Sequence, residues 1–328
     1  MIQWLQQLPK YWRNRNAITY LLWPFEVIYQ IAWYLRQVAI RLGFIQQHRV
    51  NATVIVVGNV VVGGGGKTPL TMALVQRLVK QGFRVGVVSR GYGRAQTSLQ
   101  IVNAQSLASE VGDEPLMIFQ KCNVPVVVGA QRVAAARQLL NQFPAVNVLV
   151  CDDGLQHIAL QRDIEICVMD ATGLGNGHLL PAGPLREPWP RQVDLLLHTH
   201  QRTLPEGFES LRELSSFALT SDGQQVPIAE LKLNPVEVVS GIAKPEAFLA
   251  MLAQGQFQIR HSTALPDHDH FQTWQPSHPE LPLLCTEKDA VKLWARFPKA
   301  LAMPLVFEPE PSFWKAFDQL FQSRHRYH

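Results

Sequence analysis

The stretch that decides the fold is GNVVVGGGGKTPL, residues 58–70, which is close to a phosphate-binding loop but departs from its strict pattern. The pattern G-x-x-x-x-G-K-[ST] begins with a glycine where this chain has Val61. Positive φ angles and close approach to a phosphate remain available from the four glycines that follow, Gly63, Gly64, Gly65 and Gly66. The missing glycine therefore weakens the match to the sequence pattern, but it does little to weaken the expectation that this loop binds phosphate.

The flanking residues give this loop the context that a nucleotide site needs. An apolar strand, ATVIVVG, precedes it, and an amphipathic helix is predicted over residues 69–81. Backbone N–H groups and the helix dipole would then face the phosphates, with Lys67 reaching the β and γ oxygens and Thr68 helping to hold Mg²⁺. A glycine-rich turn that only packs a strand against a helix is the alternative, and the register of Lys67 and Thr68 argues against it.

Several further apolar runs end in turn residues, and they predict strands that are buried on both faces. They are FRVGVVS, VPVVVG, VNVLVCDDG, IEICVMD and VDLLLH. Helical patterns between them, such as residues 131–142, indicate an α/β fold, a P-loop NTPase-like parallel sheet with helices on both faces. We expect an N-terminal helical segment at residues 1–50, a kinase domain at 51–222, and a smaller C-terminal α/β/α unit with a hairpin linker at 223–328.

Two aspartates, Asp152 and Asp153, follow the predicted strand VNVLV. A carboxylate at the end of a strand beside a phosphate loop is where a P-loop enzyme holds magnesium. Paired aspartates after a strand also occur as turn or cap residues, and the neighbouring Lys67 favours the metal interpretation here.

The N-terminal stretch LLWPFEVIYQIAWYLRQVAIRLG predicts a helix that starts near Pro24 and ends near Gly43, roughly 19 residues and about 28 Å long. Its polar residues fall on one stripe: Glu26, Gln30, Gln37 and Arg41. That stripe favours a membrane-associated amphipathic helix lying on a bilayer surface, with basic flanks for anionic lipid. An ordinary core helix and a membrane span are the alternatives.

Composition sets broad limits on function. The chain has 328 residues, 47% hydrophobic and 17% charged, with a net charge of +4, which fits a globular protein and does not call for a nucleic-acid partner. Four widely spaced cysteines indicate neither a zinc knuckle nor a disulfide framework, so a reducing cytoplasm is the simplest setting. No cleavable signal is recognisable at the N-terminus.

Polar motifs recur in family order across residues 58–293, and together they resemble the tetraacyldisaccharide 4′-kinase family of the lipid A pathway. They are GNVVVGGGGKTP, SRGYGR, VGDEP, CDDGLQH, GPLREP, PDHDHF and TEKDAVKL. The family's own loop is similarly relaxed at its first position. Gly65 departs from the family, which usually has threonine there.

The resemblance implies an enzyme that transfers the γ-phosphate of ATP to the 4′-hydroxyl of a tetraacylated disaccharide 1-phosphate, giving lipid IVA in lipopolysaccharide biosynthesis. It implies two α/β/α units with the active site between them and an N-terminal helix on the inner membrane. We expect the acylated disaccharide lipid and the cytoplasmic face of that membrane as partners, and a monomer.

The resemblance also implies that Asp113 is the catalytic aspartate and His268 its histidine partner, with Lys67 completing the catalytic set. A metal pair at His268 and His270 is the rival interpretation of PDHDHF. From the residues themselves, Asp152, Asp153 and Glu187 are candidates for Mg²⁺ and its surroundings. Two arginines, Arg132 and Arg186, suit phosphate oxygens, and the disaccharide or its 1-phosphate would face Arg90 and Tyr92.

Two other functions remain open from the sequence. A membrane-associated switch or partitioning ATPase also combines a relaxed loop with an amphipathic helix, but it carries a signature lysine where this chain has Val62. A soluble P-loop kinase for a polar metabolite would explain the catalytic groups but not the aromatic-rich helix.

Overall fold

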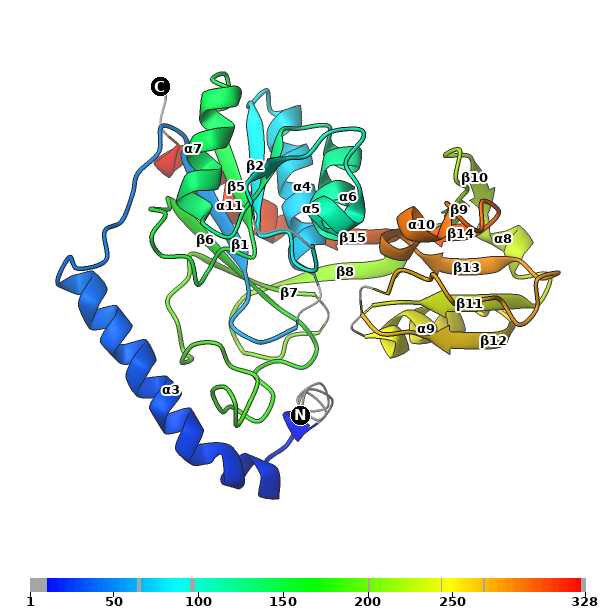
Figure 1. Ribbon diagram of the computed structural model, residues 1–328, viewed down its shortest axis with the longest axis horizontal. Coiled ribbons are helices and arrows are strands. Elements are labelled where there is room, and N and C mark those ends of the chain that lie inside the picture. The colour runs from blue at the N-terminus through cyan, green and yellow to red at the C-terminus, as the bar shows by residue number, and fades with distance from the viewer. Residues whose placement is uncertain are drawn as a thin grey trace.

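The strand before the glycine loop, β1 (Thr53–Gly58), lies in the middle of the larger of two sheets (Figure 1). The computed structural model describes residues 11–63, 66–94, 98–199, 201–242, 244–267 and 269–325. The larger sheet has nine strands in the order β15 (Leu305–Pro309), β8 (Phe208–Leu214), β7 (Leu195–His198), β6 (Ile164–Met169), β1, β5 (Val148–Asp152), β2 (Val85–Ser89), β4 (Val126–Val128) and β3 (Gln100–Ile101).

Neighbouring strands from β8 to β4 pair in parallel, and the two edge strands pair antiparallel. On one face, Ile55 and Val57 of β1 share a core with α4 (Lys67–Lys80), α6 (Asp113–Cys122) and α11 (Pro311–Arg324). On the other face, Val54 and Val56 pack in a core with α7 (Arg132–Gln142). The predicted α/β architecture, a parallel sheet with helices on both faces, is confirmed.

The smaller sheet has six strands in the order β10 (Gln225–Pro227), β9 (Phe217–Leu219), β14 (Leu301–Met303), β13 (Leu283–Thr286), β11 (Val236–Ser240) and β12 (Ile259–Ala264). Its helices are α8 (Ile228–Leu231), α9 (Pro245–Gln254) and α10 (Glu287–Leu293). A short helix, α5 (Ala108–Val111), directly precedes α6 in the larger unit.

The chain crosses between the sheets at two adjacent points. Strands β8 and β9 are separated by residues 215–216, and β14 and β15 by Pro304 alone, yet each pair is split between the two sheets. The Ser215 N–H donates to the Pro304 carbonyl at 2.9 Å, so the crossings lie side by side.

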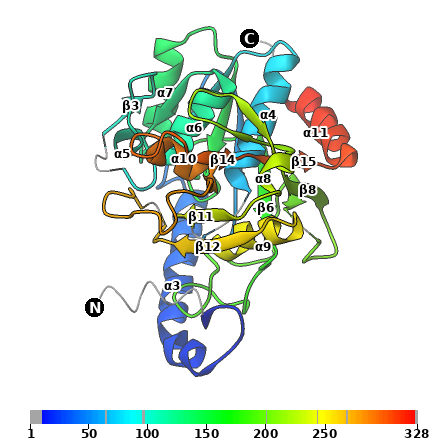
Figure 2. The same ribbon diagram turned by 90° about the vertical axis from the view of Figure 1, so that its right-hand side faces the viewer.

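Sheet membership differs from the expected boundary at the C-terminus. Residues 223–328 were expected to form one unit, but β15 and α11 belong to the larger sheet and its core. Figure 2 shows α11 beside α4, where Arg77 and Asp318 form an ion pair of 2.5 Å. The reason is the antiparallel pairing of β15 with β8, which carries the chain back to the first unit.

The N-terminal helix α3 (Ala17–Arg41) starts earlier than its sequence predicted. Its N-cap is Asn16, whose side chain accepts from the N–H groups of Ile18 and Thr19, and Pro24 lies inside the helix. The expected start at Pro24 was wrong, because an asparagine whose side chain satisfies free N–H groups is the stronger start signal.

The two faces of α3 have opposite surroundings. Glu26 of the polar stripe contacts the larger unit: it is buried, and its carboxylate accepts from Leu179 N–H and lies against His178, each at 2.7 Å. Gln30 and Arg41 of the same stripe are exposed. The apolar face is exposed at Tyr20, Leu21, Trp23, Ile28, Ile31, Tyr34 and Leu35, which contradicts the ordinary core helix. Figure 1 shows α3 and the smaller sheet on opposite sides of the molecule. No helix in the described part of the chain is both long enough and apolar enough to cross a bilayer.

Candidate active site

The glycine loop joins the carboxyl end of β1 to the start of α4, as the sequence predicted. Gly66 caps the helix with φ +102°, and a Cβ at this position would collide with the side chain of Thr199. Only glycine fits there without strain, which explains why the loop keeps a glycine directly before its lysine. Gly63 also has a positive φ, +82°, while Gly64 and Gly65 lie outside the described residues.

Lys67 bends over this loop and joins it to the neighbouring strand. Its Nζ lies 3.2 Å from the Gly63 carbonyl, 3.3 Å from Asn59 Oδ1 and 3.5 Å from Asp153 Oδ1. Asn59 also donates to the Gly63 carbonyl at 2.8 Å, which braces the loop from inside. Sequence reasoning quoted Asn59 within the loop but gave it no role.

The two aspartates at the end of β5 have contrasting environments. Asp152 is buried and accepts from the Thr71 hydroxyl at 3.1 Å, and burial, with Glu114 and Asp153 adding, raises its pKa to about 7. Burial alone would also raise the pKa of Asp153, but Lys67, Arg186 and Arg132 together hold it below the usual value. Asp153 is thus the counter-ion of Lys67 and Arg186, whereas the Asp152 carboxylate accepts from a neutral hydroxyl.

The two arginines expected at phosphate oxygens already have protein partners. Arg186 Nη1 lies 3.1 Å from Asp153 Oδ1. Arg132 is buried and donates to the carbonyls of Gly129, at 2.6 Å, and Asp153, at 3.3 Å, while its buried Nε has no hydrogen-bond partner in the described part of the chain. Burial lowers the pKa of Arg132, and these two hydrogen bonds use two of the five N–H groups of its guanidinium.

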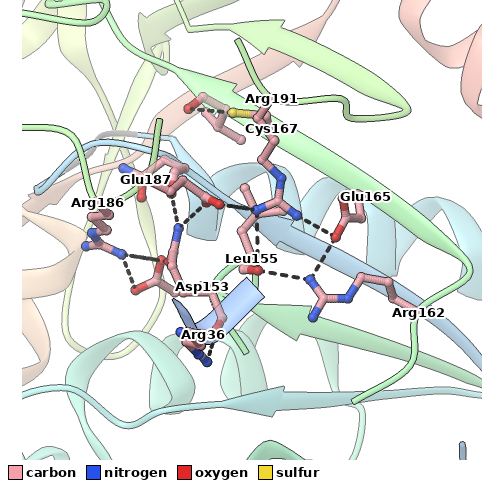
Figure 3. A network of polar contacts seen from close by, with 12 residues as sticks. Arg36, Asp153, Leu155, Arg162, Glu165, Cys167, Arg186, Glu187 and Arg191 are labelled. Carbon is pink, nitrogen blue, oxygen red and sulfur yellow. Dashed lines mark hydrogen bonds and ion pairs between the residues drawn. The ribbon is translucent and has the colours of Figure 1, made fainter. Parts of the chain in front are cut away.

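Glu187, a candidate for magnesium or its surroundings, is held by other side chains. Arg191 Nη1 donates to both of its oxygens, at 2.8 and 2.9 Å, and Gln156 Nε2 donates to Oε1 at 2.9 Å. Figure 3 shows Arg191 between Glu187 and Glu165, with Arg162 beyond. Because an arginine occupies both oxygens, Glu187 suits a supporting position better than a metal ligand.

We predict that this network of ion pairs stabilises the folded protein, and the variant Arg191→Leu tests this prediction. The change leaves Glu165 and Glu187 without their shared cation in a poorly solvated place, so we expect the free energy of unfolding to fall by about 3–5 kcal/mol. Urea denaturation followed by circular dichroism measures it. The control is Arg202→Leu, whose exposed pair with Glu209 should contribute about 1 kcal/mol or less. Equal effects in the two variants would contradict the prediction.

Asp113 is the first residue of α6 and is buried. Its carboxylate lies 3.2 Å from the Nζ of Lys292, which α10 carries from the smaller unit. The structure thus brings Asp113 to the junction of the two units. His268 lies outside the described residues, so its expected partnership with Asp113, and its rival metal pairing with His270, remain predictions.

A cavity of about 350 Å³ lies between α3 and the strand ends. Its lining combines Tyr29, Trp33 and Arg36 of α3 with Arg90, Asp153, His157 and Arg186. Tyr29 donates to the Arg186 carbonyl at 2.7 Å, which fixes α3 to the cavity wall. Arg90 therefore lines this cavity, whereas Tyr92 is largely exposed.

His157 is a cavity residue that sequence reasoning missed. Burial, with Arg132 and Arg90 adding, lowers its pKa to about 4. The imidazole is therefore neutral at physiological pH and offers both a donor and an acceptor to a polar ligand. The sequence did offer a signal for this histidine, because it lies four residues after Asp153 in the turn that follows β5.

Comparison with known proteins identifies the family of this chain. The family model described as tetraacyldisaccharide-1-P 4′-kinase, LpxK, matches residues 18–324. Among relatives named tetraacyldisaccharide 4′-kinase, one from Polaromonas naphthalenivorans is 49% identical, over 96% of this chain and 94% of its own, and one from an Acidovorax species is 48% identical, over 94% and 92%. A crystal structure of LpxK from Aquifex aeolicus in complex with ATP has a TM-score of 0.83 and 30% identity, covering 94% of this chain and 100% of that one. The chain therefore belongs to the tetraacyldisaccharide-1-P 4′-kinase family.

Proposed function

We propose that this chain transfers the γ-phosphoryl group of ATP to the 4′-hydroxyl of a tetraacylated glucosamine disaccharide 1-phosphate, giving lipid IVA. Family membership supports the kinase activity, and the ATP complex of the Aquifex relative supports the donor. The observation that carries the proposal is the cavity, because it joins Asp153, the counter-ion of Lys67, to the aromatic residues of α3. Residues around the phosphate loop and aromatic residues of α3 therefore line the same cavity.

On the nucleotide side, the loop N–H groups and Lys67 bind the β- and γ-phosphates. Thr68 and Asp152 fit Mg²⁺ because both supply oxygen ligands, whereas Asp153 and Glu187 are engaged by cations. The described residues hold no cluster of three or more acidic, histidine or cysteine side chains for a metal, so phosphate oxygens and water would complete its coordination. When bound, Mg²⁺ would neutralise part of the negative charge on the phosphate oxygens.

On the acceptor side, Asp113 takes the proton of the 4′-hydroxyl as general base, oriented by His268. The 4′-oxygen forms a bond to the γ-phosphorus while the bond to the β,γ-bridging oxygen breaks, and the electron pair leaves with ADP. Arg132 and Arg186 then face phosphate oxygens, which their planar guanidinium groups suit. Arg90 and Tyr92 contact the disaccharide or its 1-phosphate, and the neutral His157 lines the same cavity as Arg90.

The test is transfer of label from [γ-³²P]ATP to detergent-dispersed tetraacyldisaccharide 1-phosphate. A labelled bis-phosphorylated lipid is the expected product. ATP hydrolysis without a lipid product would contradict the proposed lipid acceptor and would favour a switch ATPase. Transfer to a water-soluble sugar phosphate, but not to the lipid, would favour a kinase for polar metabolites.

The exposed apolar face of α3 supports peripheral association with a membrane surface. By analogy with the family we expect this surface to be the cytoplasmic face of the inner membrane, and the enzyme to be a monomer. Aromatic and aliphatic side chains share that face, while Glu26 and Tyr29, on another side of the helix, form hydrogen bonds with the larger unit. A helix anchored by its polar side presents its apolar side to the headgroup region, where Trp and Tyr are favoured. The lipid substrate then enters the cavity along α3.

We predict that Ile28→Ser with Leu35→Ser weakens binding to vesicles of phosphatidylcholine and phosphatidylglycerol by about tenfold or more. Each side chain is more than half exposed, and burying one in an apolar phase contributes about 1.5–3 kcal/mol. Sedimentation with vesicles measures the partition coefficient. Leu233→Ser, on the smaller unit and also exposed, is the matched control. An unchanged partition coefficient in the double variant would remove α3 as the membrane-binding surface.

A further inference from the structure

Three lysines bridge α6 of the larger unit and α10 of the smaller one. Lys121 pairs with Glu287 at the outer end of this junction. Lys288 lies 4.0 Å from Glu114 and 3.4 Å from Asp267. The innermost pair is Lys292 with Asp113, at 3.2 Å. These ion pairs differ in burial: the Lys121 side chain is 34% exposed, while Lys292 and Asp113 are 6% and 7% exposed.

Lys292 is confined by groups of its own unit before it reaches Asp113. Its Nζ lies 3.8 Å from Asp289 Oδ1 and 5.4 Å from the centre of the Phe271 ring, a cation–π distance. Asp289 is itself fixed, because Oδ2 accepts from Gly241 N–H at 3.0 Å and from the Thr286 hydroxyl at 2.7 Å. The ammonium group is thus placed by the smaller unit and aimed at the first residue of α6.

A buried cation so close to the proposed base must influence it. A carboxylate that accepts the proton of an alcohol has to be ionised and turned toward that alcohol. A charge-assisted hydrogen bond to Oδ2 favours the ionised form and fixes the rotation of the carboxylate. The outer lysines contact other acidic residues and offer Asp113 neither effect.

We propose that Lys292 is a positioning residue for phosphate transfer, supplied by the smaller unit to hold Asp113 of the larger one. The inference rests on the proposed function, in which Asp113 is the general base. The reaction centre is then shared between the units: α6 carries the base, and α10 carries a lysine that helps to orient it together with His268.

The test compares Lys292→Met, Lys292→Arg and the matched control Lys121→Met in the lipid phosphorylation assay. We expect Lys292→Met to lower kcat by about 10- to 100-fold, the range typical of groups that orient a reactive ligand, with KM for ATP within about twofold. Lys292→Arg keeps the cation and should recover much of the rate. Lys121→Met weakens the same junction away from Asp113 and should keep the wild-type kcat. An unchanged kcat in Lys292→Met, or an equal loss in Lys121→Met, would overturn the proposal.

Coupling to Asp113 separates positioning from a purely structural effect. In an Asp113→Asn background, adding Lys292→Met should change the residual kcat by less than about twofold, because the group through which Lys292 acts is already gone. A loss as large as in the wild-type background would mean that Lys292 acts independently of Asp113. If Lys292→Met melts at a much lower temperature, Lys292→Met with Asp289→Asn removes the unpaired buried charge, and its kcat should remain low.

The outcomes distinguish this inference from the proposed function. A wild-type enzyme that forms no labelled lipid would remove the function itself. An Asp113→Asn variant with wild-type turnover would keep the function and remove both the base and its positioning residue. Normal turnover in Lys292→Met alone, with Asp113→Asn inactive, would remove only the role of Lys292.

Discussion

Lys67→Ala is expected to lower kcat for lipid phosphorylation by about 10²- to 10³-fold or more, while the protein stays folded. Groups that stabilise charge in a transition state typically have effects of this size, and the γ-phosphoryl group carries that charge here. The Nζ group lies above the loop between the Gly63 carbonyl, Asn59 and Asp153, which places its positive charge where the phosphates are proposed to bind. Initial rates at saturating ATP and lipid measure the loss.

Folding should survive the change because the loop keeps its other supports. Asn59 still donates to the Gly63 carbonyl, and Arg186 still pairs with Asp153. A shift of the melting temperature by about 2–4 °C, equivalent to roughly 1 kcal/mol for a domain of this size, is expected. Lys80→Ala, at the exposed end of the same helix, is the control and should keep the wild-type rate. Near-normal turnover in Lys67→Ala would remove the phosphate loop from the mechanism.

The part of the fold that carries this lysine could be predicted because its signals are local. Each parallel strand is a short run of Val, Ile and Leu that ends in turn residues, and parallel strands align their carboxyl ends at one edge of the sheet. Lys67, Asp152 and Asp153 therefore had to meet, and the ion pair of 3.5 Å between Lys67 and Asp153 agrees. The opposite electrostatic environments of the two aspartates depend on Arg186, which is 33 residues from Asp153, and were not visible in the sequence.

Other features were missed because their causes lie far apart in the chain. β14 and β15 are separated by Pro304 alone but join different sheets, and nothing local marks which sheet an edge strand enters. The contact between Lys292 and Asp113 spans 179 residues. The early start of α3, in contrast, had a local signal in Asn16, which was overlooked in favour of Pro24.

Asp113→Asn is expected to lower kcat by about 10²- to 10⁴-fold, the range for loss of a general base, while the dissociation constant for ATP stays within about threefold. The amide keeps the size of the side chain but cannot accept the hydroxyl proton. Turnover should therefore fall while the protein still folds. ATP should still bind because Lys67, Thr68 and Asp152 lie on other elements, the start of α4 and the end of β5.

Two measurements separate a base from a metal ligand at this position. Isothermal titration with ATP and Mg²⁺ reports nucleotide affinity, and the lipid assay reports turnover. Glu110→Gln, in the short helix before Asp113, is the matched control and should change neither quantity. If ATP affinity collapses together with turnover in Asp113→Asn, then Asp113 belongs to the magnesium site. The proton acceptor would then have to be sought elsewhere, and the contact with Lys292 would orient a metal ligand instead of a base.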